Sequence, residues 1–139
     1  MKYSKDLCNI PSCPPANCLN INIEAYRFVF NPICNASFIP QGKTKPQRIV
    51  NATSDSIRCS LLGLSMFTDE TKAIDKYKQL KKSFKNLGKT IGTHLAKGKI
   101  EPLDGLGTPP DKQSHFDFFE KSGIDLSKKF EITQDLSGV

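Results

Sequence analysis

The sequence predicts a single α+β domain: a mostly antiparallel sheet of five to six strands, with one main amphipathic helix over residues 69–87 packed on it. Three observations predict this class. The chain has 139 residues, close to the usual size of one domain. Runs of aromatic and β-branched residues, typical of strands, recur between turn residues. One long stretch carries apolar residues at three- and four-residue steps, which is typical of an amphipathic helix.

The first 22 residues are expected to form an extended arm without a helix, and residues 23–139 the domain itself. Pro11, Pro14 and Pro15 fall in the arm. Proline fixes φ and removes a backbone donor, so it disfavours both helix and strand interiors.

Residues 23–30 are predicted to form the first strand, because aromatic and β-branched residues dominate them. Side chains alternate across a strand, so Arg27 shares a small apolar face with Ala25 and Val29, while Tyr26 lies on the opposite face. The charged side chain of Arg27 therefore lies on a strand face whose other residues are typical of a hydrophobic core.

A long polar connection follows over residues 35–56, with a basic cluster of Lys43, Lys45 and Arg48. A connection of this length in a compact domain is usually functional or mobile. Residues 57–67 are continuously apolar and are predicted to form a buried strand.

The helix at 69–87 has Thr68 as its predicted N-cap and Gly88 as its stop. Its apolar stripe consists of Ala73, Ile74, Tyr77, Leu80, Phe84 and Leu87. Beyond it, residues 90–100 are predicted to form a short helix or strand, and residues 101–114 a turn-rich loop. Residues 115–120 and 129–133 are predicted to form the last two strands.

The chain is basic, with a net charge of +6, which favours acidic partners. The charge is concentrated: Lys72–Lys99 holds nine lysines and one acid. This face is predicted to contact a nucleotide, a nucleic acid or an acidic protein; the alternative is a solvated helix face. This face and the smaller basic cluster at 43–48 lie outside the strands that carry the candidate catalytic residues. We therefore expect that mutations can remove binding through charge without removing catalysis, and the reverse.

No apolar run reaches the length of a membrane helix, so no membrane partner is predicted. The first residues lack the apolar stretch of a secretory signal, which predicts a cytoplasmic protein. In that compartment the five cysteines are expected to be free thiols.

Three of the cysteines, Cys8, Cys13 and Cys18, have the spacing C-x4-C-x4-C. A structural zinc site needs a second ligand pair, which this pattern lacks, so no metal is predicted. A zinc site built on these three residues with a distant fourth ligand is the alternative.

Arg27 lies on the first predicted strand, Ser65 on the second, just before the helix, and Glu120 ends a later strand. This pattern resembles ADP-ribosyltransferase-like domains. The resemblance implies NAD as cofactor, with Arg27 and the neighbouring Tyr26 contacting the nucleotide and Ser65 shaping the nicotinamide pocket. It implies that Glu120 directs attack on the ribose. The sequence departs from the family at Ser65, which is not followed by Thr and Ser, and two residues before Glu120, where no second acid stands.

His115 is a further catalytic candidate. It shares a strand face with Asp117, and such a pair is suited to acid–base work. The leading functional hypothesis is accordingly an NAD-dependent ADP-ribosyltransferase-like enzyme or nucleotide-using effector. The alternative is a non-enzymatic basic binding module, such as an antitoxin, an immunity-type inhibitor or a nucleic-acid accessory protein.

Overall fold

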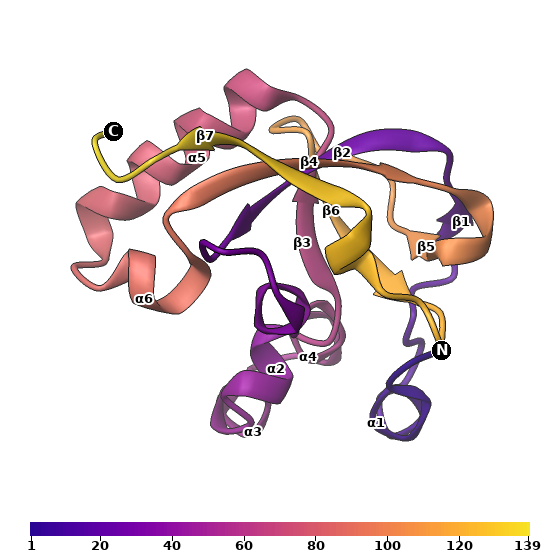
Figure 1. Cartoon of the computed structure of the whole chain (residues 1–139). Helices are drawn as coiled ribbons and strands as arrows, with labels where there is room; N and C mark the ends of the chain where they lie inside the picture. The colour runs from indigo at the N-terminus through magenta and orange to yellow at the C-terminus, as the bar shows by residue number, and fades with distance from the viewer.

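A computed structural model describes all 139 residues and has an α+β fold built on one antiparallel sheet (Figure 1). Its seven strands are β1 (Leu19–Asn20), β2 (Ile23–Val29), β3 (Leu64–Phe67), β4 (His94–Ile100), β5 (Gly105–Gly107), β6 (His115–Glu120) and β7 (Phe130–Asp135). In space they follow the order β1-β5-β6-β3-β2-β4-β7. The predicted class is confirmed, with one strand more than expected.

Six helices and three 3-10 turns connect the strands. The helices are α1 (Ser4–Cys8), α2 (Gln41–Thr44), α3 (Gln47–Asn51), α4 (Asp55–Ser60), α5 (Glu70–Ser83) and α6 (Leu87–Ile91). The 3-10 turns are η1 (Asn35–Phe38), η2 (Pro102–Asp104) and η3 (Leu126–Lys128). None of the helices is long and apolar enough to cross a membrane.

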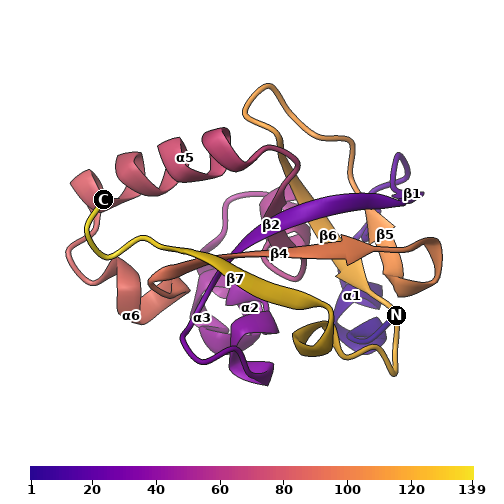
Figure 2. The same cartoon turned by 45° about the horizontal axis from the view of Figure 1, so that its top comes forward.

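The sheet opens between its two central strands. β2 pairs with β4 along its whole length, but with β3 only where Tyr26 faces Phe67. Beyond that pair the strands separate, and Figure 2 shows β6 crossing the direction of β2, β4 and β7. Where β2 and β3 are not paired, residues of both strands line an open space, together with residues of neighbouring segments.

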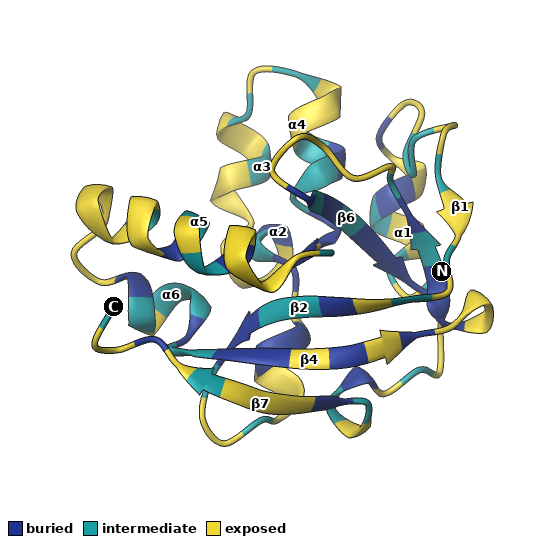
Figure 3. Ribbon diagram, turned by 90° about the horizontal axis from the view of Figure 1, so that it is seen from above, coloured by how far each residue is buried: buried dark blue, intermediate teal, exposed yellow.

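One face of the sheet is covered by α5, which the apolar periodicity predicted. Its N-cap is Asp69, whose carboxylate accepts from the Lys72 backbone N–H at 2.9 Å, and not the expected Thr68. The buried residues of this layer are Phe28, Phe67, Ala73, Tyr77, Leu87, Leu95 and Leu136. The outward face of α5 is exposed (Figure 3). The helix ends at Ser83, four residues before the predicted end, because Phe84 turns into solvent and Leu87 packs from the separate helix α6.

The opposite face of the sheet forms a second apolar layer. It contains Ala25, Val29, Phe38, Leu64, Met66, Ala96, Ile100, Phe116, Phe118, Leu126 and Phe130. Side chains from η1, η3 and β7 close this layer, so the long connection after β2 is partly a lid on the core. That connection, expected to be an irregular loop, contains η1, α2 and α3.

The prediction of a strand over 57–67 is wrong in its first half. Ser54 caps helix α4 by accepting from the Ile57 backbone N–H at 3.2 Å. Cys59 and Leu62 are buried three residues apart, while Ile57 is exposed, which is the spacing of a helical face and not of a strand. Only Leu64–Phe67 extends into the sheet.

The expectation of an arm without a helix is wrong at α1. The prolines all follow residue 10, so nothing prevents a helical turn before them. Leu7 and Ile10 are buried against Cys59 and Phe119, which anchors this segment to the domain. The expectation of five free thiols is also wrong in this structure: Cys13 is bonded to Cys59, and Cys8, Cys18 and Cys34 remain free.

The C-terminal half follows the sequence more closely. The ambiguous segment 90–100 divides into the end of α6 and the strand β4, because Gly92 adopts a positive φ of 98° between them. The strand at 115–120 is confirmed as β6, and the last strand runs to Asp135 rather than to residue 133. The loop at 101–114 contains η2 and the short strand β5.

Candidate functional site

A groove of about 1090 Å³ lies where β2 and β3 separate. It is lined by residues of both strands, of the helices α2, α5 and α6, and of η1. Arg27, Ser65 and His115 all line it. The sheet opening thus produces the concave surface on which a candidate site can be built.

Ser65 and His115 contact each other in this groove. Ser65 Oγ lies 2.8 Å from His115 Nε2, a hydrogen-bond distance in either direction of donation. The strand register explains the contact: Ser65 faces Asp117 and Phe67 faces His115, so these side chains share one face of the sheet. The His115 ring also packs edge-on against Phe67, with centroids 5.4 Å apart, which fixes its orientation.

Two carboxylates flank the imidazole. Asp111 Oδ2 lies 4.0 Å from His115 Nδ1, and Asp117 Oδ1 lies 3.9 Å from Nε2. These distances are too long for hydrogen bonds. The other oxygen of Asp111 accepts from the backbone N–H groups of Gln113 and His115, which holds the loop before β6. Burial raises the pKa of Asp117.

Arg27 is a fixed cation at the same groove. Its Nε donates to the Ser37 carbonyl at 2.9 Å and its Nη1 to the Ser65 carbonyl at 2.8 Å. Its guanidinium carbon lies 5.8 Å from the centre of the Phe38 ring. No carboxylate lies within ion-pair distance of it. Burial lowers the pKa of Arg27 to about 10, and the residue still carries its charge at neutral pH.

The groove is lined by cations and by no acid. Besides Arg27, its basic lining residues are Lys45, Arg48, Lys76 and Lys89. The chain contains 14 acidic residues, yet none of them lines the groove. The aromatic lining residues are Phe28, Phe30, Phe67 and Phe84. Cationic and aromatic surface together suit an anion that carries a flat apolar part.

The two basic clusters of the sequence therefore meet. Lys45 and Arg48 come from the connection after β2, and Lys76 and Lys89 come from α5 and α6. The expectation that charge and chemistry lie apart is wrong for these four residues, because folding brings both clusters to the groove of Ser65. The remaining lysines of α5 are exposed.

Glu120 and Tyr26, the other two predicted site residues, do not line the groove. Glu120 lies on the opposite face of the sheet from Ser65, where its carboxylate pairs with Lys2 at 2.7 Å. Tyr26 lies beneath the Lys97 ammonium, which is 6.0 Å from its ring centre. The structure brings Ser65 and His115 into contact on one face of the sheet, and Arg27, which shares the other face with Ala25 and Val29, lines the groove where the sheet is open.

Sequence reasoning missed two kinds of site residue. Asp111 gave no signal, because its contact with His115 depends on the loop closing onto β6. The cluster containing Lys45 and Arg48 was visible as a basic run, but its position over the groove depends on the fold of α2 and α3. No group of three or more His, Cys, Asp or Glu residues is placed to hold a metal ion, and one of the three cysteines of the zinc alternative is used by the bond to Cys59.

The chain matches no known protein-family model, no curated protein sequence and no solved structure. The site is therefore interpreted from its own geometry.

Proposed function

We propose that the protein is a nucleotide-using enzyme of the ADP-ribosyltransferase-like kind, with NAD as its cosubstrate in the groove between β2 and β3. The observation that carries the proposal is the composition of the groove: five basic residues, no acid, and the Ser65–His115 contact at 2.8 Å. The sequence pattern of Arg27 and Ser65 resembles the same class, and Glu120, the third residue of that pattern, lies outside the groove.

Arg27 is the first phosphate-binding candidate. Two of its five N–H donors are used by the carbonyls of Ser37 and Ser65, and the others are available to a ligand. An arginine held by backbone contacts is pre-organised, so little side-chain freedom is lost on binding. The Lys76 and Lys89 ammonium groups would add to the attraction for a diphosphate.

His115 takes the acid–base role in this proposal. Breaking the bond between nicotinamide and ribose builds positive charge on the sugar, and the attacking group must lose a proton. In this proposal His115 takes up that proton at Nε2, the atom that Ser65 Oγ contacts, and the carboxylates of Asp111 and Asp117 lie beside the ring. Glu120, buried on the opposite face, has no part in this reaction scheme.

Release of nicotinamide from NAD tests the proposal. The wild-type protein should release nicotinamide, and the exposed-lysine variant Lys99→Gln should do so at the same rate, because Lys99 does not line the groove. His115→Gln should lower the rate by about 10²- to 10⁴-fold, the usual contribution of a general base. Turnover that is unchanged in His115→Gln would exclude this assignment.

A second candidate function is a non-enzymatic basic binding module. It is favoured by Lys78 and Lys82 of α5 and by Lys85 just after it, which are exposed and form no ion pair. The partner would be a nucleic acid or an acidic protein. Binding to a polyanion such as heparin should then weaken steeply as salt concentration rises. Affinity that does not change with salt would rule this function out.

The cytoplasm is the proposed location, because the three free cysteines suit a reducing compartment and NAD is the proposed cosubstrate. In that compartment the Cys13–Cys59 bond would be in equilibrium with the two thiols. Quenching cells in acid and alkylating the denatured protein, followed by mass spectrometry, tests the location, because Cys59 is buried in the folded protein. Full alkylation of both cysteines is the expected result, and a stable bond between them in cells would contradict it.

A further inference from the structure

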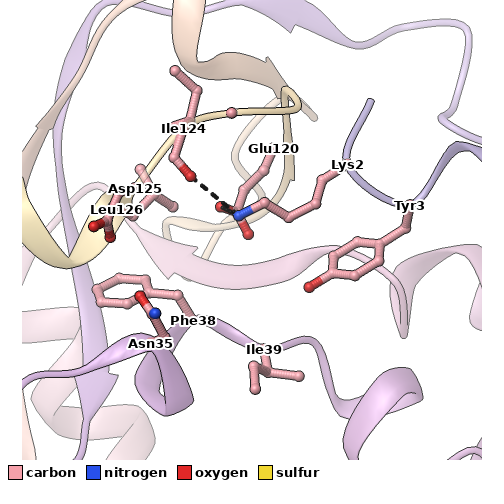
Figure 4. Close-up of a pocket in the computed structure, with 10 residues that line it drawn as sticks. Lys2, Tyr3, Asn35, Phe38, Ile39, Glu120, Ile124, Asp125 and Leu126 are labelled. Carbon is pink, nitrogen blue, oxygen red and sulfur yellow. Dashed lines mark hydrogen bonds and ion pairs between the residues drawn. The ribbon is translucent and has the colours of Figure 1, made fainter.

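A second pocket, of about 450 Å³, lies on the opposite side of η1 from the groove. Its walls come from the first residues of the chain, from η1 and from the segment that follows β6 (Figure 4). It shares only Ile39 with the lining of the groove. Neither Lys2 nor Glu120, the charged pair of this pocket, takes part in the proposed function.

The carboxylate of Glu120 is the central polar group of this pocket. Its side chain is only 1% exposed. Oε2 accepts from the Lys2 ammonium at 2.7 Å, whereas Oε1 is buried and has no hydrogen-bond partner. A buried carboxylate oxygen without a donor is unfavourable, because it has lost its water and gained nothing in exchange.

Lys2 reaches this carboxylate from a segment that lies against β6. Its ammonium also donates to the Ile124 carbonyl at 3.1 Å, and its backbone N–H donates to the Glu120 carbonyl at 2.9 Å. Figure 4 shows the ammonium of Lys2 and the carboxylate of Glu120 meeting within the pocket, with Phe38 and Ile39 opposite. The Lys2 side chain is 32% exposed and the Glu120 side chain 1%, so a solute reaches the carboxylate only where it takes the place of the Lys2 side chain.

We propose that this pocket is a binding site for an organic cation, an alkylammonium or guanidinium group, and that Lys2 is an internal occupant which such a ligand displaces. Two acceptors already meet at one cation position, Glu120 Oε2 and the Ile124 carbonyl, and Oε1 of the same carboxylate has no hydrogen-bond partner. Phe38 and Leu126, which are buried, supply an apolar wall for the carbon chain of the ligand. Burial raises the pKa of Glu120, and a bound cation would favour its ionised form.

The experiment is an NMR titration of ¹⁵N-labelled protein with n-butylammonium chloride, using n-butanol as the neutral control ligand. It compares the wild type with Lys2→Ala, with Lys2→Ala/Glu120→Gln, and with Lys5→Ala. Lys5 is an exposed lysine of the same segment that makes no ion pair, so it is a matched control. Lys2→Ser is the second test variant if Lys2→Ala loses its native spectrum.

Lys2→Ala should show saturable shifts at Glu120, Ile124 and Leu126 with butylammonium and none with butanol. The wild type and Lys5→Ala should show the same shifts at roughly tenfold higher ligand concentration, because Lys2 competes for the site. The double variant should show none. Natively folded Lys2→Ala or Lys2→Ser without saturable shifts would overturn the proposal, as would equal binding by the double variant.

A second ligand distinguishes a free amine from a lysine side chain of a polypeptide as the natural occupant of the site. N-acetyl-lysine N-methylamide carries the same ammonium on a peptide backbone. If it binds Lys2→Ala at least as tightly as butylammonium, the site accepts a lysine side chain of a polypeptide. If only butylammonium binds, the site accepts a free amine.

Discussion

At the scale of single residues, Arg27 connects the sequence to the site. The alternation of side chains predicted that it would stand on the small apolar face of the first strand, and it does so between the buried residues Ala25 and Val29. Its two carbonyl partners could not be predicted, because Ser37 and Ser65 come from segments that meet only in the folded chain.

The Ser65–His115 contact was not predicted either, although both residues were candidates. The sequence analysis placed Ser65 and Glu120 in one site, because their order along the predicted strands resembles that of ADP-ribosyltransferase-like domains. The register between β3 and β6 decides otherwise: it places Ser65 with His115 on one face and Glu120 on the other. A register between distant strands is fixed by packing and not by local pattern.

Ser65→Ala and His115→Gln should lower turnover without a comparable loss of NAD affinity. Ser65→Ala keeps the bond from Arg27, because that bond ends on the Ser65 backbone carbonyl. Residues that act as one unit are not additive, so the double variant should be no slower than the slower single variant. Rates that multiply in the double variant would show that the two side chains act separately.

Glu120→Gln should alter how stability depends on pH. Burial raises the pKa of Glu120, so the folded state binds this proton more tightly than the unfolded state does. As pH rises from the unfolded-state pKa through the folded-state pKa, the wild type therefore loses free energy of unfolding at this residue. The glutamine variant does not titrate there.

Urea denaturation of both proteins between about pH 4 and pH 7 measures this effect. The free energy of unfolding of Glu120→Gln, relative to that of the wild type, should increase with pH. A constant or decreasing difference would mean that the ion pair with Lys2 outweighs the cost of burial.

At the scale of elements, long periodic segments were predictable and short ones were not. The period of α5 and the aromatic run of β6 located both elements. The helix α4 was missed because its apolar residues are continuous with those of β3, and only the Ser54 cap separates a helix from a strand there. The helix α1 is too short for a periodic signal and depends on burial of Leu7.

Tyr77→Phe should destabilise the docking of α5. The Tyr77 hydroxyl is buried and donates to the Gly92 carbonyl at 2.9 Å, which connects α5 to the turn before β4. Its loss should lower the free energy of unfolding by about 1 kcal/mol. Tyr26→Phe is the control, since the Tyr26 hydroxyl makes no hydrogen bond within the protein and the residue is half-buried. Chemical denaturation of both variants should show a loss for Tyr77→Phe alone.

Reduction of the Cys13–Cys59 bond should also lower stability. The bond joins the N-terminal arm to α4 across a sequence separation of 46 residues. Cross-links that close loops of this size stabilise a domain by about 2–4 kcal/mol. Cys13→Ser should reproduce the loss and become insensitive to reductant, whereas Cys34→Ser, at an exposed free cysteine, should behave like the wild type. A wild type whose denaturation is the same with and without reductant would contradict this.

At the scale of the whole molecule, the structure shows where basic residues of the chain gather, which is at the groove between β2 and β3. Composition predicted an acidic partner and located two basic clusters, but it could not predict that Lys45, Arg48, Lys76 and Lys89 line one groove. That convergence depends on the opening of the sheet between β2 and β3. The fold class was predictable from local patterns; the site was not, because it lies where segments distant in sequence meet.

Calorimetric titration with NAD tests the central claim most directly, which is that this groove binds a nucleotide through its cations. The matched variants are Lys76→Gln, which removes a cation of the groove, and Lys99→Gln, which removes an exposed one outside it. Saturable binding by the wild type and Lys99→Gln is expected, with affinity about fivefold weaker in Lys76→Gln for a lost contact of roughly 1 kcal/mol. No binding of NAD to the wild type, or equal affinity in all three proteins, would contradict the account.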